Sequence, residues 1–193
     1  MRKLLPNINK SVRWQGRMLF LLGLCSMMGA FSVACQKPEI WHEYRSPEGT
    51  FVVEFPGKSE ETSRTSPLSN GDVKYPQIRW NGNGVSLDIT YAEIPDLRVL
   101  NKDEAKEYYE FLRTQMVKMN HSQLMQSEDI IVNGKSGQDF TEVRQGGKVA
   151  RYRLFLLGTK LLSLRAEQDV GVRPITETSS TVEKFMTSLR FPE

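Results

Sequence analysis

The second half of this chain is a series of short apolar segments separated by pairs of turn-forming residues. Residues 85–91, VSLDITY, alternate between apolar and polar side chains, which is typical of a strand with one buried face. The pairs Asn133-Gly134 and Gly146-Gly147 divide the later segments at the spacing of tight hairpins. The pattern predicts an antiparallel meander over residues 123–168.

Two further strands are expected before this meander. Residues 51–55 place Phe51, Val53 and Phe55 on one face, and residues 73–80 are strand-like, with Pro76 favouring an edge or a bulge. Residues 58–72 are polar and rich in turn-forming residues, so they are predicted to be a loop. The alternation within residues 85–91 places Asp88 on the outward face.

Two segments have the spacing of amphipathic helices. Asn101 can cap a helix over residues 102–119, with Glu104 at the capping-box position. Apolar residues at i, i+3, i+4 and i+7 predict a second helix over about 175–189. Strands and helices in this order predict an α+β fold, with a central antiparallel sheet of about six to eight strands and two main helices packed on it.

The N-terminal 34 residues have a different composition. They contain five basic residues and no acidic residue, and they end in the uncharged run Met18–Ala34. A basic start, an apolar run and the small residues Ser32 and Ala34 are the pattern of a secretory signal peptide. The run is short for a membrane span, which needs about 20 apolar residues. Residues 1–34 are therefore predicted to be a signal peptide of the lipoprotein type, and the alternatives are a soluble secreted protein or an uncleaved anchor.

Residues 32–35, SVAC, resemble the lipobox of bacterial lipoproteins. The resemblance implies that cleavage leaves Cys35 as a lipidated N-terminus, with residues 35–40 as a tether and 41–193 as a single domain. Two or more acyl chains give stable anchoring in a membrane. It also implies a location in the bacterial cell envelope, on the outer membrane or the outer face of the inner membrane, and Gln36 would permit export to the outer membrane.

The basic leader accounts for the net charge of +3. Its five basic residues reduce the 26 of the whole chain to 21 when they are removed, against 23 acidic residues, so the remaining chain does not indicate nucleic-acid binding. If Cys35 is lipidated, no thiol remains for a disulfide or a cysteine-based zinc site. His42 and His121 lack ligand spacing, and no GxSxG or complete P-loop motif occurs. We expect no cofactor, no metal and no enzymatic activity.

Three arginines are the candidate anion or partner contacts of the domain. Arg151 and Arg153 flank Tyr152, and Arg165 lies on the next predicted strand. On one solvent-facing surface they could receive carboxylate or phosphate groups. The alternative is cross-strand pairing with Glu142, Glu167 or acidic residues of a helix.

Three neighbouring aromatic residues lie on the predicted helix 102–119. Tyr108, Tyr109 and Phe111 cannot all face one core. Either Phe111 or Tyr108 is an exposed contact, or all three pack within a wide apolar stripe.

Several segments resemble the PsbP-like fold, an α/β/α sandwich on a central antiparallel sheet that is known from extrinsic subunits of photosystem II. They cover most of residues 41–191 and consist of YRSPEGTFVVEFPG, the helix after YAEIPD, GGKVARYRLFLLGTKLLSLRAEQ and FMTSLRF. The resemblance is structural, and no binding residue is carried over. We expect a lipid-anchored, non-catalytic envelope protein that binds or helps assemble a membrane or periplasmic protein partner. The alternatives are an accessory subunit of a photosynthetic membrane complex, a small-ligand carrier and an envelope enzyme.

Overall fold

The structure is a computed structural model that describes residues 40–68, 71–94, 97–169 and 179–192, all within the unit Glu39–Glu193. For residues 66–68 and 71–74 it describes the backbone alone. The predicted signal peptide, Cys35 and most of the tether lie outside the described residues. Their roles therefore remain predictions.

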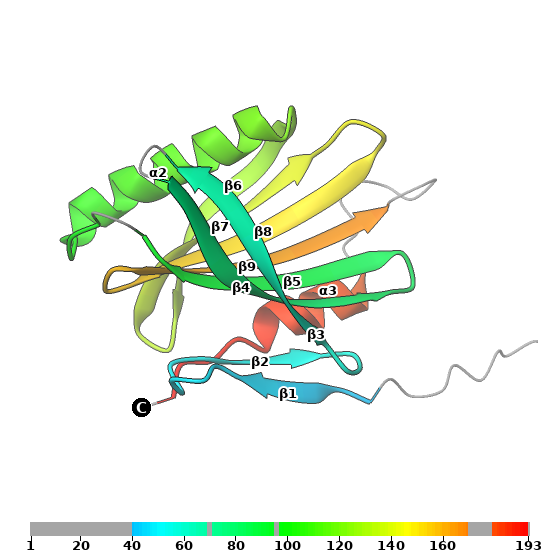
Figure 1. Ribbon diagram of the computed structural model, residues 1–193. Coiled ribbons are helices and arrows are strands. Elements are labelled where there is room, and N and C mark those ends of the chain that lie inside the picture. Colours follow the sequence, from blue (N-terminus) through cyan, green and yellow to red (C-terminus); the bar gives the residue numbers. More distant parts are fainter. Residues whose placement is uncertain (1–39, 69–70, 95–96, 170–178, 193) are drawn as a thin grey trace, which may run out of the picture. The chain divides into compact units, whose positions relative to one another are not determined.

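Seven of the described strands form one antiparallel sheet in the order β3-β4-β5-β9-β8-β7-β6 (Figure 1). This sheet and its β6-β7-β8-β9 meander confirm the fold predicted from the turn pairs. β1 and β2 form a separate two-stranded hairpin. The bounds are β1 His42–Arg45, β2 Val52–Phe55, β3 Glu60–Leu68, β4 Gly71–Gly82, β5 Val85–Glu93, β6 Gln123–Val132, β7 Lys135–Val143, β8 Lys148–Leu157 and β9 Lys160–Asp169.

The two predicted helices are present as α2 (Lys102–Met119) and α3 (Ser180–Thr187). The Asn101 side chain accepts hydrogen bonds from the backbone of Asp103 and Glu104, and the Glu104 carboxylate accepts one from the Asn101 backbone, all at 3.0 Å. This capping box explains why α2 begins where the sequence predicts. α3 lies within the predicted range, of which residues 175–178 are not among those described.

The two faces of the large sheet are covered unequally (Figure 1). α3 and the β1–β2 hairpin lie over one face and close a large apolar core. Phe185 of α3 packs against Phe55 of β2 with ring centroids 5.2 Å apart, and both residues are fully buried. We call this side the closed face. α2 covers only part of the other side, which we call the open face.

Tyr109 fixes α2 to the sheet at the point where β7 and β8 stop pairing. Its hydroxyl accepts a hydrogen bond from the Leu156 backbone at 2.7 Å and donates one to the Ser136 carbonyl at 3.2 Å. The hydroxyl thus stands in for a bond of the β7–β8 ladder, whose last pair is Gly137 and Phe155. A Cβ atom on Gly137 would lie 2.5 Å from the Leu154 carbonyl, so only glycine fits there.

The predicted loop over residues 58–72 was wrong. Most of it is the edge strand β3, which pairs with β4 from Glu60 to Leu68. Residues 60–65 are exposed, so they show no alternation of buried and exposed side chains. Such a strand is held by backbone hydrogen bonds, which leave no hydrophobic pattern in the sequence.

Pro76 lies in β4, which is an inner strand of the sheet rather than an edge strand. β4 pairs with β5 only from Gln77 onward. On that side the proline therefore has no ladder partner to lose, which explains how a residue without an N–H group is tolerated.

Candidate functional site

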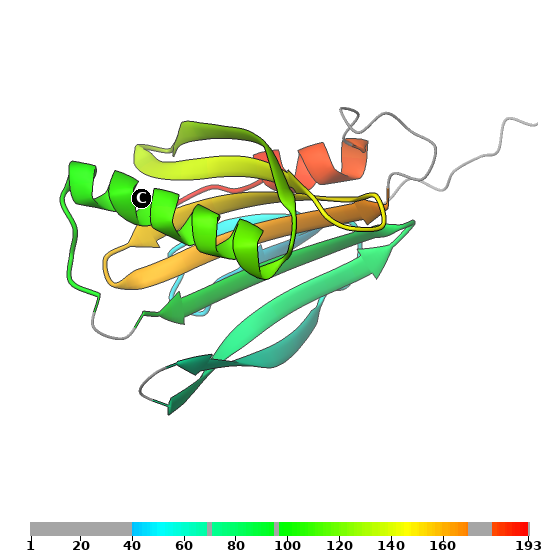
Figure 2. The same cartoon turned by 90° about the horizontal axis from the view of Figure 1, so that it is seen from above.

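A groove of about 750 Å³ lies on the open face, between α2 and the uncovered part of the sheet. Figure 2 shows α2 to one side of this face, with β4 and β3 extending away from it. The lining of the groove comes from α2 and from strands β3, β4, β5, β8 and β9, together with Ile94, Asn120 and Arg144.

The groove exists because side-chain size changes across the sheet. Under α2 this face carries Phe140, Tyr152 and Leu154, which are buried. On β5 and β9 the same face carries Thr90 and Ser163, which are cross-strand partners. These shorter side chains leave a hollow that the helix does not fill.

One stripe of α2 forms the apolar wall of the groove. Tyr108, Leu112, Met116 and Met119 recur at intervals of four, four and three residues, which places them on one side of the helix. Met119 is 70% exposed, so this wall ends at the solvent.

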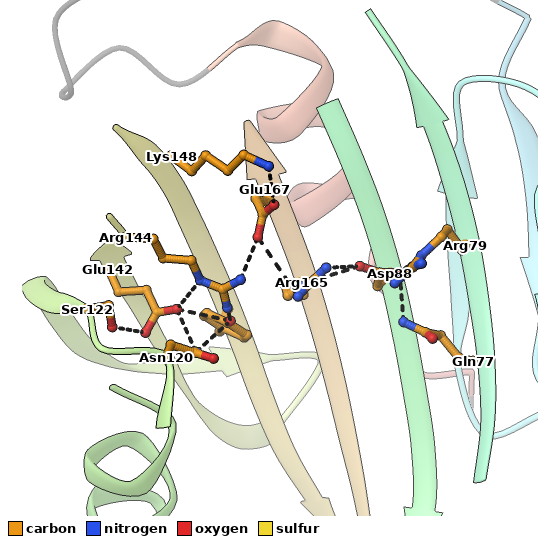
Figure 3. A network of polar contacts seen from close by, with 11 residues as sticks. Gln77, Arg79, Asp88, Asn120, Ser122, Glu142, Arg144, Lys148, Arg165 and Glu167 are labelled. Carbon is orange, nitrogen blue, oxygen red and sulfur yellow. Dashed lines mark hydrogen bonds and ion pairs between the residues drawn. The ribbon is translucent and has the colours of Figure 1, made fainter. Parts of the chain in front are cut away.

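A network of ion pairs and hydrogen bonds forms one end of the groove and is drawn in Figure 3. Its first centre is Glu142, which is fully buried. The carboxylate accepts hydrogen bonds from Asn120 (2.8 Å), Ser122 (2.7 Å), Arg144 (2.8 Å) and Tyr152 (3.2 Å). Three of the donors bond to Oε1 and Ser122 bonds to Oε2, so Glu142 acts as a structural anchor. It ties the C-terminal end of α2 to the sheet.

The second centre is Asp88, which is 2% exposed although the alternation of β5 predicted it to face outward. Gln77 donates to it at 2.8 Å, Arg79 at 2.5 Å and Arg165 at 3.0 Å. Asp88 does lie on the face opposite Leu87 and Ile89, as predicted, but that face is here the floor of the groove, where the three donors compensate the burial of the charge.

Glu167 joins the two centres. It accepts a hydrogen bond from Arg144 at 2.6 Å and lies 3.9 Å from Arg165 and 3.5 Å from Lys148. The ion pairs thus connect four cations, Arg79, Arg144, Lys148 and Arg165, with three carboxylates. Lys148 does not line the groove, and the three arginines balance the three carboxylates.

Burial sets the protonation of the tyrosine in this network. Burial and the charge of Glu142 together raise the pKa of Tyr152 to about 12, against the opposing effect of Arg144 and Arg165. The pKa of Arg144 is also raised, because its contacts with Glu142 and Glu167 outweigh the opposing effect of burial. Tyr152 therefore stays neutral and Arg144 stays charged well above neutral pH.

The three candidate arginines do not share one surface. Arg165 is the cross-strand partner of Tyr152, so it faces the groove, whereas Arg151 and Arg153 alternate with Tyr152 and face the other way. Arg151 donates to Asp139 at 2.9 Å and to Glu183 of α3 at 2.9 Å. Arg153 donates to Asp139 at 2.7 Å and to the Met186 carbonyl at 2.6 Å.

In the structure these three arginines form ion pairs within the domain, which is the alternative to anion binding. Arg165 pairs with Asp88, and Arg151 with an acidic residue of a helix. Glu142 pairs with Arg144 instead of any of the three. Their role in contacting an anion or a partner stays a prediction, and Arg165 alone lines the groove.

The three aromatic residues of α2 point in different directions, as their spacing on a helix requires. Tyr109 is buried, Tyr108 lines the groove and Phe111 is 55% exposed. Phe111 still contacts Tyr108, with ring centroids 6.1 Å apart. An exposed aromatic next to the groove extends its apolar surface.

A histidine or metal site is not evident in the described part of the chain. His42 lies on β1 and His121 follows α2, and both are exposed. Residues 40–192, outside the gaps, hold no group of three or more histidine, cysteine or acidic residues arranged to bind a metal. Within the same residues, neither helix is long and apolar enough to cross a membrane.

The sequence could have revealed part of this network. Glu142 and Arg144 stand two residues apart at the end of a predicted strand, and Asp88 interrupts the most regular strand of the chain. Their partners Asn120, Arg79 and Arg165 come from other elements, and their proximity depends on strand order. Local sequence patterns do not determine strand order, so they do not reveal these contacts.

Comparisons with known proteins bear on the fold. No protein-family model and no curated protein matches this sequence. The solution structure of cyanobacterial PsbP (CyanoP) from Synechocystis is similar, with a TM-score of 0.57 and 11% identity over 83% of this chain and 98% of that one. The Ran-binding protein Mog1p from Saccharomyces cerevisiae has a TM-score of 0.48 and 11% identity over 79% of this chain and 96% of its own, which is too weak to carry an argument. The chain thus has a PsbP-like fold; at this identity the similarity shows the fold alone.

Proposed function

We propose that this chain is a lipid-anchored, non-catalytic protein of the bacterial cell envelope that binds or helps assemble a protein partner. The open-face groove is the observation that carries the proposal. It has an apolar wall that ends at the solvent in Met119, and a polar end held in place by buried ion pairs. A rigid, accessible groove with these two characters suits recognition of another molecule.

The anchoring part of the proposal rests on the sequence. The leader of residues 1–34 and Cys35 in SVAC support lipid attachment, export and a domain in the periplasm or outside the cell. The tether of residues 35–40 is short, so a lipidated Cys35 would hold the domain close to the membrane surface. In this view the lipid provides localisation and the groove provides recognition.

The chemistry of the groove favours binding over catalysis. Asp88 in the lining and Glu142 at the end of the groove are buried, and each carboxylate accepts hydrogen bonds from several internal donors. A general base needs a free lone pair directed at the substrate. The PsbP-like fold does not by itself favour an accessory role in a photosynthetic complex, because that likeness is limited to the fold.

A small-ligand carrier is the second candidate. The volume of about 750 Å³ lies within the range of ligand pockets, roughly 300 to 1,000 Å³. The same groove therefore supports either a protein partner or a small molecule.

Crosslinking in native membranes tests the proposal. The tagged chain and a Cys35→Ala variant are fractionated, crosslinked and analysed by mass spectrometry. We expect the wild type in the membrane fraction with one specific protein partner, and the variant released from the membrane without that partner. Membrane attachment of the wild type without any captured protein would contradict the partner role and favour the carrier.

A further inference from the structure

The dimensions of the groove restrict what can occupy it. The apolar wall runs from Tyr108 to Met119, which is about 16 Å along a helix that rises about 1.5 Å per residue. An extended chain advances about 3.3 Å per residue, so five residues span the wall.

The floor offers hydrogen bonds that the protein does not use. Thr90 and Ser163 lie side by side on neighbouring strands and both line the groove. Neither hydroxyl makes a hydrogen bond with another described residue. A hydroxyl both donates and accepts, so this pair can bond to the N–H and C=O groups of a bound backbone. An acyl chain would instead desolvate both hydroxyls without replacing their bonds to water, which is unfavourable.

The charge of the groove is positive. The charged residues of its lining are Arg64, Arg144 and Arg165 against Asp88 and Glu93, which leaves a balance of one positive charge. Arg64 is exposed and forms no ion pair within the described part of the chain. Of the two acidic residues in the lining, Asp88 is buried in its pairs, which leaves Glu93 as the accessible one. An occupant with carboxylate groups complements this surface.

The apolar wall of the groove can bind apolar side chains of different shapes. Met116 and Met119 are unbranched and polarisable, so they adapt to different apolar groups. Apolar side chains on one side of an extended peptide would meet this wall, while its backbone meets the hydroxyls of the floor.

We propose that the groove binds an extended peptide segment of about five residues that carries both apolar and acidic side chains. The inference rests on the proposed partner-binding function and names the kind of segment that the partner would present. The adaptable wall implies a class of related sequences rather than a single one.

Selection from a random heptapeptide display library tests this directly, with the full chain held in phospholipid nanodiscs. We expect enrichment of peptides with apolar and acidic residues. A selected peptide should shift the ¹³C-methyl NMR signals of Met116 and Met119 and leave that of Met186, which is buried on the closed face, unchanged.

Two variants connect binding to the groove. Met119→Glu adds a negative charge to the wall and should weaken peptide binding at least tenfold, whereas Ile131→Glu, at a residue 75% exposed on β6, should change it less than twofold. Met119→Leu keeps the apolar wall and should bind like the wild type. Both glutamate substitutions are at surface positions, so folding is retained.

Several results would overturn the inference. Equal affinity for the wild type and Met119→Glu would place the peptide elsewhere, and a basic consensus would contradict the charge argument. Absence of enriched peptides, with sodium oleate shifting the two methyl signals, would assign the groove to an acyl chain. If membrane crosslinking still captured a protein partner in any of these cases, the proposed function would stand and the peptide inference alone would fail.

Discussion

The two faces of the seven-stranded sheet belong to the same strands, but one face is covered by a hydrophobic core and the other is partly exposed. On the closed face, α3 and the β1–β2 hairpin meet side chains such as Leu87, Ile89 and Phe155, which are fully buried. On the open face, α2 packs on β7 and β8 and leaves β5 and β4 uncovered. One sheet thus provides a hydrophobic core on one side and an accessible groove on the other.

The comparison separates stability from recognition. The closed face buries the larger apolar cluster, and apolar burial is the main favourable term in folding. Buried carboxylates lie on both faces, Asp88 and Glu142 on the open face and Asp139 on the closed face, and such charges stabilise little compared with apolar packing, although breaking one pair is costly. Substitutions on the two faces should therefore have different consequences.

The largest effect is expected on the closed face. Phe185→Ala removes a fully buried ring that packs on Phe55, and should lower the free energy of unfolding by about 4 kcal/mol. Urea denaturation of the two proteins measures the difference. A loss below about 1 kcal/mol would mean that this face is not the main source of stability.

The network on the open face should show the next largest effect. Glu142→Gln removes the charge that Arg144 and three further donors require, and should cost about 3 kcal/mol. Glu183→Gln is the matched control, because Glu183 also pairs with an arginine but has a side chain 47% exposed. It should cost less than about 0.5 kcal/mol in the same denaturation experiment. Equal costs would contradict the view that burial gives the Glu142 network its importance.

Alkaline pH should weaken the open face in particular. The pKa of Tyr152 is raised by burial and by Glu142 to about 12, above the ordinary value of 10.0, so the folded state holds the proton more tightly. The resulting stability is complete below pH 10 and is lost as the pH rises through 12, by about 3 kcal/mol. Denaturation at several pH values should show a steeper decline in the wild type than in Tyr152→Phe. Parallel curves for the two proteins would remove Tyr152 as the cause.

The smallest effect is expected at the mouth of the groove. Met119→Ala changes a side chain that is 70% exposed and should alter the free energy of unfolding by about 0.5 kcal/mol or less. Met186→Ala is the same substitution at a fully buried position of α3 and should cost about 3 kcal/mol. If both methionines cost the same, Met119 would be part of the core and the groove would be closed in solution.

The elements of the fold were accessible from the sequence wherever their signal is local. Asn101 and Glu104 define the start of α2, and Asn133-Gly134 defines the β6–β7 hairpin, because capping and tight turns involve residues close in the chain. The edge strand β3 was missed because its residues 60–65 are exposed, so no periodicity marks it.

The sequence by itself determined an antiparallel sheet with two helices, and it predicts a signal peptide followed by a lipidated Cys35. It could not determine which residues meet. Asp88 and Arg165 are 77 positions apart and pair because β5 lies beside β9. Arg165 lies opposite Tyr152, and Arg151, the next residue to Tyr152 on β8, faces the other side of the sheet. The groove likewise depends on how far α2 extends across the sheet. Hydrophobic periodicity is a property of each segment, whereas pairing, burial of charge and the shape of a groove arise only when distant segments are brought together.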